Sequence, residues 1–225
     1  MKVSLLRFTD KPDLTAALSA KVCYSNLEID KIELDNEKCG NILRKVLKSG
    51  HHSVIEHISF TFAVEGISRV ATHQLVRHRM ASYSQQSHRY TKIKPESFVL
   101  PNSIKNSKEA STLYLESIKN SLNLYEKLIE MGIKKEDARF IIPQGVSSNI
   151  VITMNARELL HFFTLRCCVR AQWEIRELAI EMLKFAKEKA PIIFENAGPA
   201  CVRGRCPEEN PCNNIAEIRE FFKKL

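Results

Sequence analysis

Residues 77–90 carry the densest set of side chains that are able to do chemistry. Their sequence, RHRMASYSQQSHRY, contains three arginines, two histidines, three serines and two glutamines. Guanidinium groups form paired hydrogen bonds with phosphate, and serine and glutamine bond to the polar edge of a ring. Burying such groups without partners would cost on the order of a few kcal/mol each. The composition therefore favours a wall that holds an anionic, hydrogen-bonding ligand, and a nucleotide fits best.

Two other interpretations compete for this segment: a solvated basic loop and a nucleic-acid patch. The flanking residues favour a ligand site. Residues 57–65 alternate apolar with polar or small side chains, which predicts a strand with one buried face. Residues 68–76 place apolar side chains at approximate helical spacing. Because the polar segment directly continues packed elements, a ligand site is favoured over a free tail.

The elements that must position this segment are mixed irregularly. Apolar stripes predict helices over residues 37–48, 108–131 and 173–189, and a β-branched run predicts a strand over 146–153. Asn155 is expected to cap a further helix, with Glu158 at the reciprocal position of a capping box. Repeated βαβ units do not occur in this order, so the sequence predicts an α+β fold.

The helix that follows Asn155 carries polar groups on two sides. Arg157 and His161 are four residues apart and share a face, whereas Arg166 lies nine residues after Arg157, about half a turn away. The leucine and phenylalanine residues between them indicate that the helix is largely buried. This pattern predicts two ligand surfaces or a subunit interface.

Composition limits the class of protein. With 225 residues, 44% hydrophobic and 27% charged, and no linker or repeat, the chain is expected to form one domain over residues 1–225. Its apolar runs are too short for a membrane span and the N-terminus lacks a signal-peptide core, so we expect a cytoplasmic protein without membrane contact. The net charge of +8 suggests anionic partners. Because the aromatic residues fall in hydrophobic patterns, nucleic acid is the weaker prediction.

Cysteine and histidine spacing does not predict a metal. Seven cysteines without a secretion signal are expected to be free thiols. The C-terminal group of Cys201, Cys206 and Cys212 lacks a CxxC pair. The histidines of residues 51–57 do not form an HExxH motif.

Four segments of the chain resemble the flavin-dependent thymidylate synthase family. Residues 77–79, followed after seven residues by Ser87, match its RHRX7S motif, and residues 50–57 (GHHSVIEH) are similar to its upstream element. Residues 137–139 with Pro143 resemble its downstream arginine element. Residues 155–166 and 171–176 resemble its C-terminal signature. The segments occur in the family's order along most of the chain.

The resemblance implies a fold, a reaction and an assembly. The fold would have mixed helices around an antiparallel sheet, and the chain would form a homotetramer with shared active sites. The reaction would be the reductive methylation of dUMP to dTMP. The carbon would come from 5,10-methylenetetrahydrofolate, the hydride from FAD, and NADPH would reduce the flavin. Since no Gly-x-Gly-x-x-Gly follows a strand, neither FAD nor NADPH would occupy a Rossmann site.

The resemblance also implies roles for individual residues. The expected FAD-binding residues are His51, Ser53, Glu56, Arg77, His78, Arg79, Gln85, Asn155, Arg157 and His161. The expected dUMP-binding residues are Gln74, Arg77, Gln85, Gln86, Ser87, His88, Arg89, Arg139 and Arg166. Arg166 is the expected catalytic residue, stabilising negative charge on the pyrimidine.

Ser87 is expected to bind substrate and not to act as a nucleophile, since no evident base adjoins it. The chain also departs from the family pattern at three positions. Ser84 and Gln85 stand where many members have Asn and Glu, and His161 stands where others carry Asn. Two alternatives stay open at this level: a flavin-dependent methylase acting on uracil in RNA, and a non-enzymatic basic module that binds nucleotides or RNA.

Overall fold

The computed structural model describes residues 1–91 and 93–225. The chain divides into two compact units whose segments interleave along the sequence. Unit 1 comprises Met1–Lys2, Val64–Arg77 and Tyr83–Val151, and unit 2 comprises Val3–Ala63, His78–Ser82 and Ile152–Leu225. The single domain expected over residues 1–225 stays a prediction.

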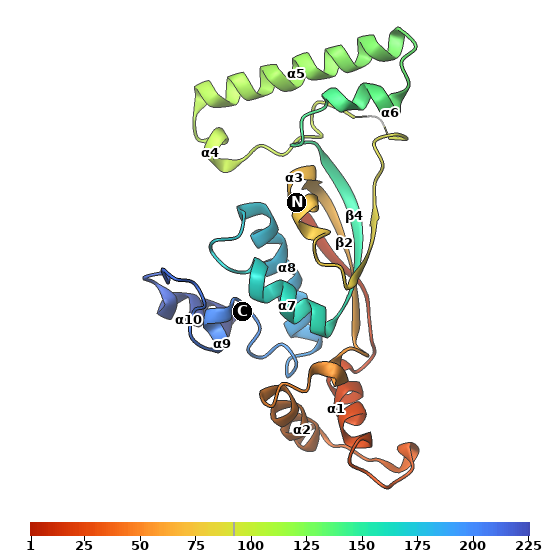
Figure 1. Cartoon of the computed structure of the whole chain (residues 1–225), viewed down its shortest axis with the longest axis vertical. Helices are drawn as coiled ribbons and strands as arrows, with labels where there is room; N and C mark the ends of the chain where they lie inside the picture. Colours follow the sequence, from red (N-terminus) through yellow and green to blue (C-terminus); the bar gives the residue numbers. More distant parts are fainter. Residues whose placement is uncertain (92) are drawn as a thin grey trace. The chain divides into compact units, whose positions relative to one another are not determined.

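One antiparallel sheet contains four strands in the order β1-β2-β4-β3 (Figure 1). The strands are β1 (Lys2–Phe8), β2 (Ser59–Ser68), β3 (Ala81–Gln85) and β4 (Ser147–Asn155). The α+β class and the antiparallel, non-Rossmann sheet are therefore confirmed.

Strand β2 forms because its side chains alternate between two environments. Phe60, Phe62 and Val64 are fully buried, whereas Ser59 and Glu65 are exposed. The predicted strand is confirmed, although it begins and ends two or three residues later than residues 57–65. Its last residue caps the next helix, as described for unit 1.

The helices of unit 2 are α1 (Pro12–Val22), α2 (Asn36–Lys48), α7 (Ala156–Arg166), α8 (Trp173–Lys189), α9 (Ala200–Arg203) and α10 (Ile215–Lys224), with short 3-10 turns η1 (Ile29–Lys31) and η2 (His52–Ile55). Figure 1 shows α7 and α8 side by side, and they are in contact. None of the helices described in either unit is both long and apolar enough to cross a membrane.

Aromatic rings join β2 to the helical layer of unit 2. The ring of Phe194 packs edge-on against Phe60 and against Phe163 of α7, with centroid distances of 5.7 and 5.8 Å. Phe62 packs against Phe185 of α8 at 6.5 Å. Because such rings bury large apolar areas and favour tilted contacts, they hold α7 in a fixed position on the strand. This fixed helix carries most of the candidate site.

Asp13 links the first helix of unit 2 to the turn that follows α8. Its carboxylate oxygens accept hydrogen bonds from the backbone N–H groups of Ile192 and Ile193 at 3.0 and 3.1 Å. Burial raises the pKa of Asp13, and the two backbone hydrogen bonds oppose that shift. The contact fixes α1 against residues that lie 179 and 180 positions later in the sequence.

Unit 1 contains α3 (Arg69–Leu75), α4 (Asn102–Lys105), α5 (Lys108–Glu130), α6 (Lys135–Ala138) and the 3-10 turn η3 (Arg139–Ile141). The Ser68 hydroxyl accepts from the Ala71 N–H at 3.1 Å and caps α3. Helix α5, predicted over residues 108–131, packs Ile118 and Leu122 against Val146. Figure 1 shows α5 running beside α6, with which it is in contact.

Candidate functional site

Helix α7 begins at the cap that the sequence predicts. The Asn155 side-chain oxygen accepts a hydrogen bond from the Glu158 N–H at 2.9 Å. The second half of the expected capping box is wrong, because the Glu158 carboxylate bonds to Nδ1 of His78 at 3.0 Å. The carboxylate therefore bonds to the polar segment of residues 77–90, called the signature segment below, and not to the helix end.

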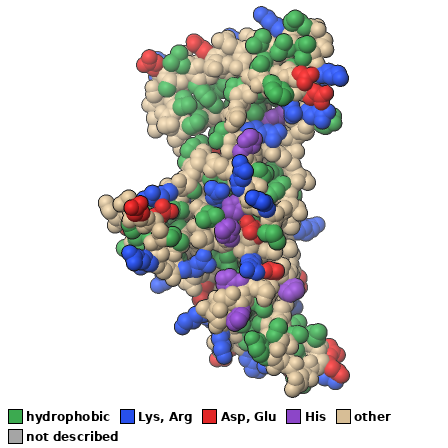
Figure 2. All heavy atoms as spheres, in the orientation of Figure 1, with side chains coloured by type: hydrophobic (Ala, Val, Ile, Leu, Met, Phe, Trp, Pro, Cys, Tyr) green, Lys and Arg blue, Asp and Glu red, His purple; other side chains and the backbone are tan. Residues whose placement is uncertain are grey.

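A pocket of about 500 Å³ opens beside α7 within unit 2. It is lined by His52, Glu56, Met80, Asn155, Arg157, Glu158, Leu160, His161, Thr164 and Arg203. Across it, Arg157 donates a hydrogen bond to the Glu56 carboxylate. Figure 2 shows arginine, lysine and histidine side chains gathered on the face of unit 2 that carries α7. The pocket thus offers cationic, amide and imidazole groups together.

His78 is the buried centre of a hydrogen-bonded chain beside this pocket. Nε of Arg166 donates to Nε2 of His78 at 3.0 Å. A guanidinium only donates, so Nε2 must supply a lone pair, and the ring proton lies on Nδ1, facing Glu158. Burial is the largest cause that lowers the pKa of His78, with the nearby Arg166 charge adding to it, while the Glu158 bond opposes it. A neutral ring fits this arrangement.

Arg166 lies about half a turn from Arg157 on α7, as the spacing predicts. Nine residues separate it from Arg157, but Glu158, Phe162 and Arg166 follow at four-residue intervals along one side of α7. His78 lies on this side, with its ring 4.9 Å from that of Phe162. Arg166 is therefore connected to the pocket residue Glu158 through His78. The second ligand surface or subunit interface expected for this helix stays a prediction.

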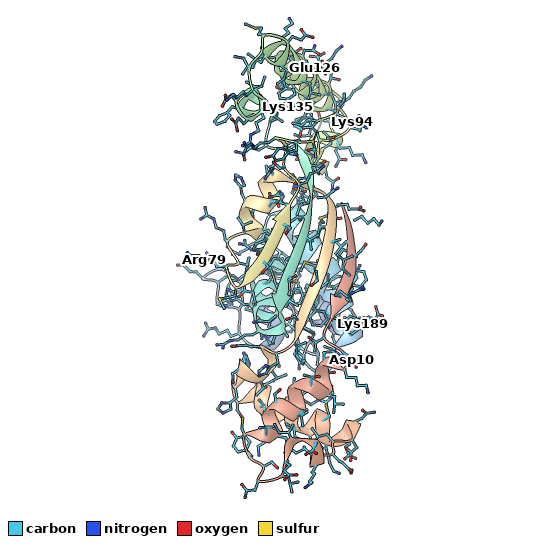
Figure 3. The ribbon with its side chains drawn as sticks, turned by 90° about the vertical axis from the view of Figure 1, so that its right-hand side faces the viewer. Asp10, Arg79, Lys94, Glu126, Lys135 and Lys189 are labelled. Atoms are coloured by element: carbon cyan, nitrogen blue, oxygen red, sulfur yellow. The ribbon has the colours of Figure 1, made fainter. Side chains whose placement is uncertain are left out.

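The remaining residues predicted in unit 2 are more exposed. His51, Ser53 and Arg79 are exposed to solvent, and Figure 3 shows Arg79 pointing away from the ribbon. Neighbouring His52 lines the pocket in place of His51. The sequence also missed Arg203, which donates to the Thr164 hydroxyl and whose pKa burial lowers. Arg203 belongs to none of the motifs and lies 39 residues beyond Thr164, so no sequence pattern indicated this contact.

In unit 1, pairing of β3 with β4 orders the middle of the signature segment. Gln85 donates to the Ser148 hydroxyl at 2.7 Å, and the Gln86 side-chain oxygen accepts from the Asn149 N–H at 3.1 Å. The His88 ring bonds to the backbone carbonyl of Ser147 at 3.2 Å. Three of the predicted dUMP residues therefore lie along one edge of β4, in a row that is called the wall below. That this wall holds a ligand stays a prediction.

Three arginines gather near the end of this wall. Arg89 forms an ion pair with Glu136, and Nε of Arg139 donates to the Glu136 carbonyl at 3.2 Å. Burial and the charge of Arg139 together lower the pKa of Arg69, whose guanidinium donates to the Gln86 carbonyl at 3.4 Å. Arg69 was not predicted, because it belongs to no motif. Together these cations form a group suited to a phosphate.

Ser87, Gln74 and Arg77 complete the predicted dUMP residues of unit 1. The Ser87 hydroxyl accepts from the Arg89 N–H at 3.3 Å, which fixes Ser87 beside the arginine group. Gln74 bonds to the Val70 carbonyl on α3 at 3.5 Å, and Arg77 is exposed.

All seven cysteines are free thiols. Burial raises the pKa of Cys201, and the neighbouring thiols of Cys206, Cys168 and Cys212 raise it further. Across residues 1–91 and 93–225, no three His, Cys, Asp or Glu side chains form a group able to hold a metal ion.

Comparison with known proteins gives one consistent result. The family described as "Thymidylate synthase complementing protein" matches residues 4–192, a range that includes every residue predicted for FAD or dUMP but not Arg203. The flavin-dependent thymidylate synthase of Geobacter sulfurreducens is 46% identical, with 100% of this chain and 99% of that protein covered. That of Pyrococcus horikoshii is 49% identical, with 100% and 98% covered.

A solved structure shares the fold. The UMP/dUMP methylase PolB from Streptomyces cacaoi, bound with 5-Br dUMP, matches with a TM-score of 0.80 at 24% identity. The match covers 86% of this chain and 93% of PolB.

Proposed function

The chain belongs to the thymidylate synthase complementing protein family, and from this premise we propose that it is a flavin-dependent thymidylate synthase, a methyltransferase that converts dUMP to dTMP by reductive methylation. One observation carries the proposal: proteins of that name are 42–49% identical to the chain over nearly its whole length. A basic binding module without catalysis would not account for this likeness.

The pocket of unit 2 fits a flavin dinucleotide in its chemistry. Arg157 and Arg203 offer N–H donors for a pyrophosphate, while Asn155 and His161 offer groups that bond to a ribose or a ring edge. Bound FAD would supply the hydride for the reduction. The predicted FAD residues outside the pocket lining, His51, Ser53, Arg77, His78, Arg79 and Gln85, are proposed on the family resemblance.

The wall and arginine group of unit 1 are proposed to hold dUMP. Ser87, Arg89 and Arg139 suit its phosphate, with the unpredicted Arg69 adding positive charge. The structural relative PolB was solved with 5-Br dUMP, which supports this ligand class. Arg166 is proposed to stabilise negative charge that develops on the pyrimidine. We further propose 5,10-methylenetetrahydrofolate and NADPH as co-substrates and a cytoplasmic location.

A direct assay tests the function. The purified protein should be yellow and release FAD on denaturation, and it should form dTMP from dUMP when methylenetetrahydrofolate and NADPH are supplied. The same preparation should leave uracil-containing RNA unmethylated. Methylation of RNA in place of dUMP would favour the RNA methylase, and a colourless protein without turnover would favour the binding module.

Replacing Ser87 with alanine should weaken dUMP binding without ending the chemistry. Loss of one hydrogen bond to a charged phosphate costs about 1.5–3 kcal/mol, so KM for dUMP should rise roughly 10- to 100-fold. Steady-state kinetics at raised dUMP should still show dTMP formation. Ser82→Ala, an exposed serine of the same segment, is the matched control. Complete loss of turnover with unchanged dUMP affinity would instead make Ser87 a nucleophile.

We propose a homotetramer whose subunits share active sites, and flavin retention should follow assembly. Helix α5 exposes Leu113 and Leu124, 62% and 49% accessible, which lie eleven residues apart and thus on one face. An exposed apolar face of this kind is typical of an interface. Replacing both leucines with glutamate should lower tetramer content and bound FAD together, as measured by light scattering and flavin fluorescence.

The exposed charge of Lys119 on α5 provides the control, since Lys119→Glu changes charge away from that face. A monomer that retains one FAD per chain would contradict the shared-site assembly but leave the enzymatic activity unaffected.

A further inference from the structure

Glu158 is a buried acid for which neither the helix cap nor the proposed ligand contacts provide a role. Its side chain is 11% exposed, and its backbone N–H is bound by the Asn155 cap, so the carboxylate is held at a fixed height on α7. From this position Oε1 reaches Nδ1 of His78 at 3.0 Å. The acid therefore faces the one histidine of the signature segment that contacts Arg166.

We propose that Glu158 is a positioning residue: it holds the His78 proton on Nδ1, so that Nε2 keeps a lone pair for Nε of Arg166. The chain of contacts runs from carboxylate to imidazole to guanidinium, with both heavy-atom distances at 3.0 Å. The inference rests on the catalytic role proposed for Arg166, and it adds the residue that orients that arginine through His78.

The hydrogen-bond donors and acceptors of Arg166 and His78 require this tautomer. A guanidinium has no acceptor, so an N–H on Nε2 would face the N–H of Arg166 and the contact would be lost. A neutral imidazole has only one N–H, and with that proton on Nδ1 an acceptor is needed on the opposite side of the ring. Glu158 supplies it, and the Phe162 ring, 4.9 Å away and nearly perpendicular, packs against the imidazole.

A simple buried ion pair between Glu158 and a charged His78 is the competing interpretation. The charges around His78 argue against a protonated ring. Arg166 and His161 of α7 lie beside His78 and disfavour a positive charge on it, whereas Glu158 is the one acid among these groups. Burial also lowers the pKa of His78 below its ordinary value. As pH falls through that lowered pKa, His78 gains a proton on Nε2 and its contact with Arg166 breaks.

Two substitutions separate the roles of the acceptor and of the charge. Glu158→Gln keeps an acceptor oxygen for Nδ1–H but removes the negative charge that raises the pKa of His78. Glu158→Ala removes both. Glu181→Gln on α8 is the control for the loss of an acidic charge, since the Glu181 carboxylate forms an ion pair with Lys184 at 2.5 Å.

The primary measurement is the tautomer of His78 from ¹⁵N shifts of the histidine-labelled, flavin-loaded protein. The wild type, Glu158→Gln and Glu181→Gln should carry the proton on Nδ1, whereas Glu158→Ala should populate the Nε2–H form. In kinetics, Glu158→Ala should lower kcat about 10- to 100-fold with KM for dUMP nearly unchanged, as loss of an orienting partner does. Glu158→Gln should retain most of kcat and move the acid limb of the kcat profile to lower pH.

An unchanged Nδ1–H tautomer in Glu158→Ala, or an acid limb that stays in place in Glu158→Gln, would overturn the inference. If Glu158→Ala does not fold, the position of the acid limb in Glu158→Gln tests the inference by itself. Failure of the proposed function gives a different result: the wild type would form no dTMP, while the tautomer would still change in Glu158→Ala. Failure of the role proposed for Arg166 alone would leave turnover intact in Arg166→Ala.

Discussion

The Arg166→Ala variant is expected to form dTMP about 10²- to 10³-fold more slowly than the wild type while remaining folded. Removing a preorganised group that stabilises charge in the transition state typically costs about 3–4 kcal/mol. Burial lowers the pKa of Arg166, as expected for a charge in a partly desolvated place, where electrostatic contacts are stronger than in water. Single-turnover kinetics with saturating dUMP measure the effect on the chemical step.

Two further arginine variants make this result specific. Arg166→Lys keeps the positive charge but lacks the fixed Nε–H that bonds to His78, so it should recover only part of the rate. Arg170→Ala removes an exposed arginine four residues later, which pairs with Glu208 at 3.6 Å, and should turn over normally. Near-normal turnover of Arg166→Ala would remove this residue from the mechanism.

Phe163→Ala should give the largest loss of stability, about 3–5 kcal/mol in the free energy of unfolding. Its ring is fully buried between Phe162 and Phe194, at 5.8 Å from each, and removing it leaves a cavity under α7. Phe221→Ala, in α10, removes a ring that is 46% exposed and should cost less than about 1 kcal/mol. Urea unfolding at fixed protein and FAD concentration compares the two. Equal losses would mean that the Phe163 site collapses around the missing ring.

The parts of the fold that were predictable are those with strong one-dimensional patterns. Alternation identified β2, apolar stripes identified α2, α5 and α8, and the Asn155 cap fixed the start of α7. Strand β1 was not predicted because it lies at the sheet edge with mostly exposed side chains, so its sequence lacks alternation. Strand β3, at the other edge, was missed because its short run of mostly polar side chains obscures a β pattern.

For the candidate site, the motifs indicated which segments carry polar side chains, but they could not indicate which distant residues meet. Residue types and spacing identified the polar wall of residues 85–88 and the polar face of α7. The contact between His78 and Glu158 spans 80 residues, and Glu158 had a sufficient local explanation as a capping residue. Arg69 and Arg203 join the candidate groups through tertiary position alone, so no spacing rule could have selected them.

The hydrogen bonds of Asp13 can form only late in the synthesis of the chain. Ile193 lies 180 residues after Asp13. Translation adds about 5–20 residues per second, so roughly 10–40 s pass between the appearance of these two residues. During that interval α1 emerges without the backbone N–H groups that its acid binds in the finished protein. The hydrogen bonds that anchor the first helix through Asp13 therefore form only after α8 has been synthesised, and a chain that ends before Ile192 lacks them.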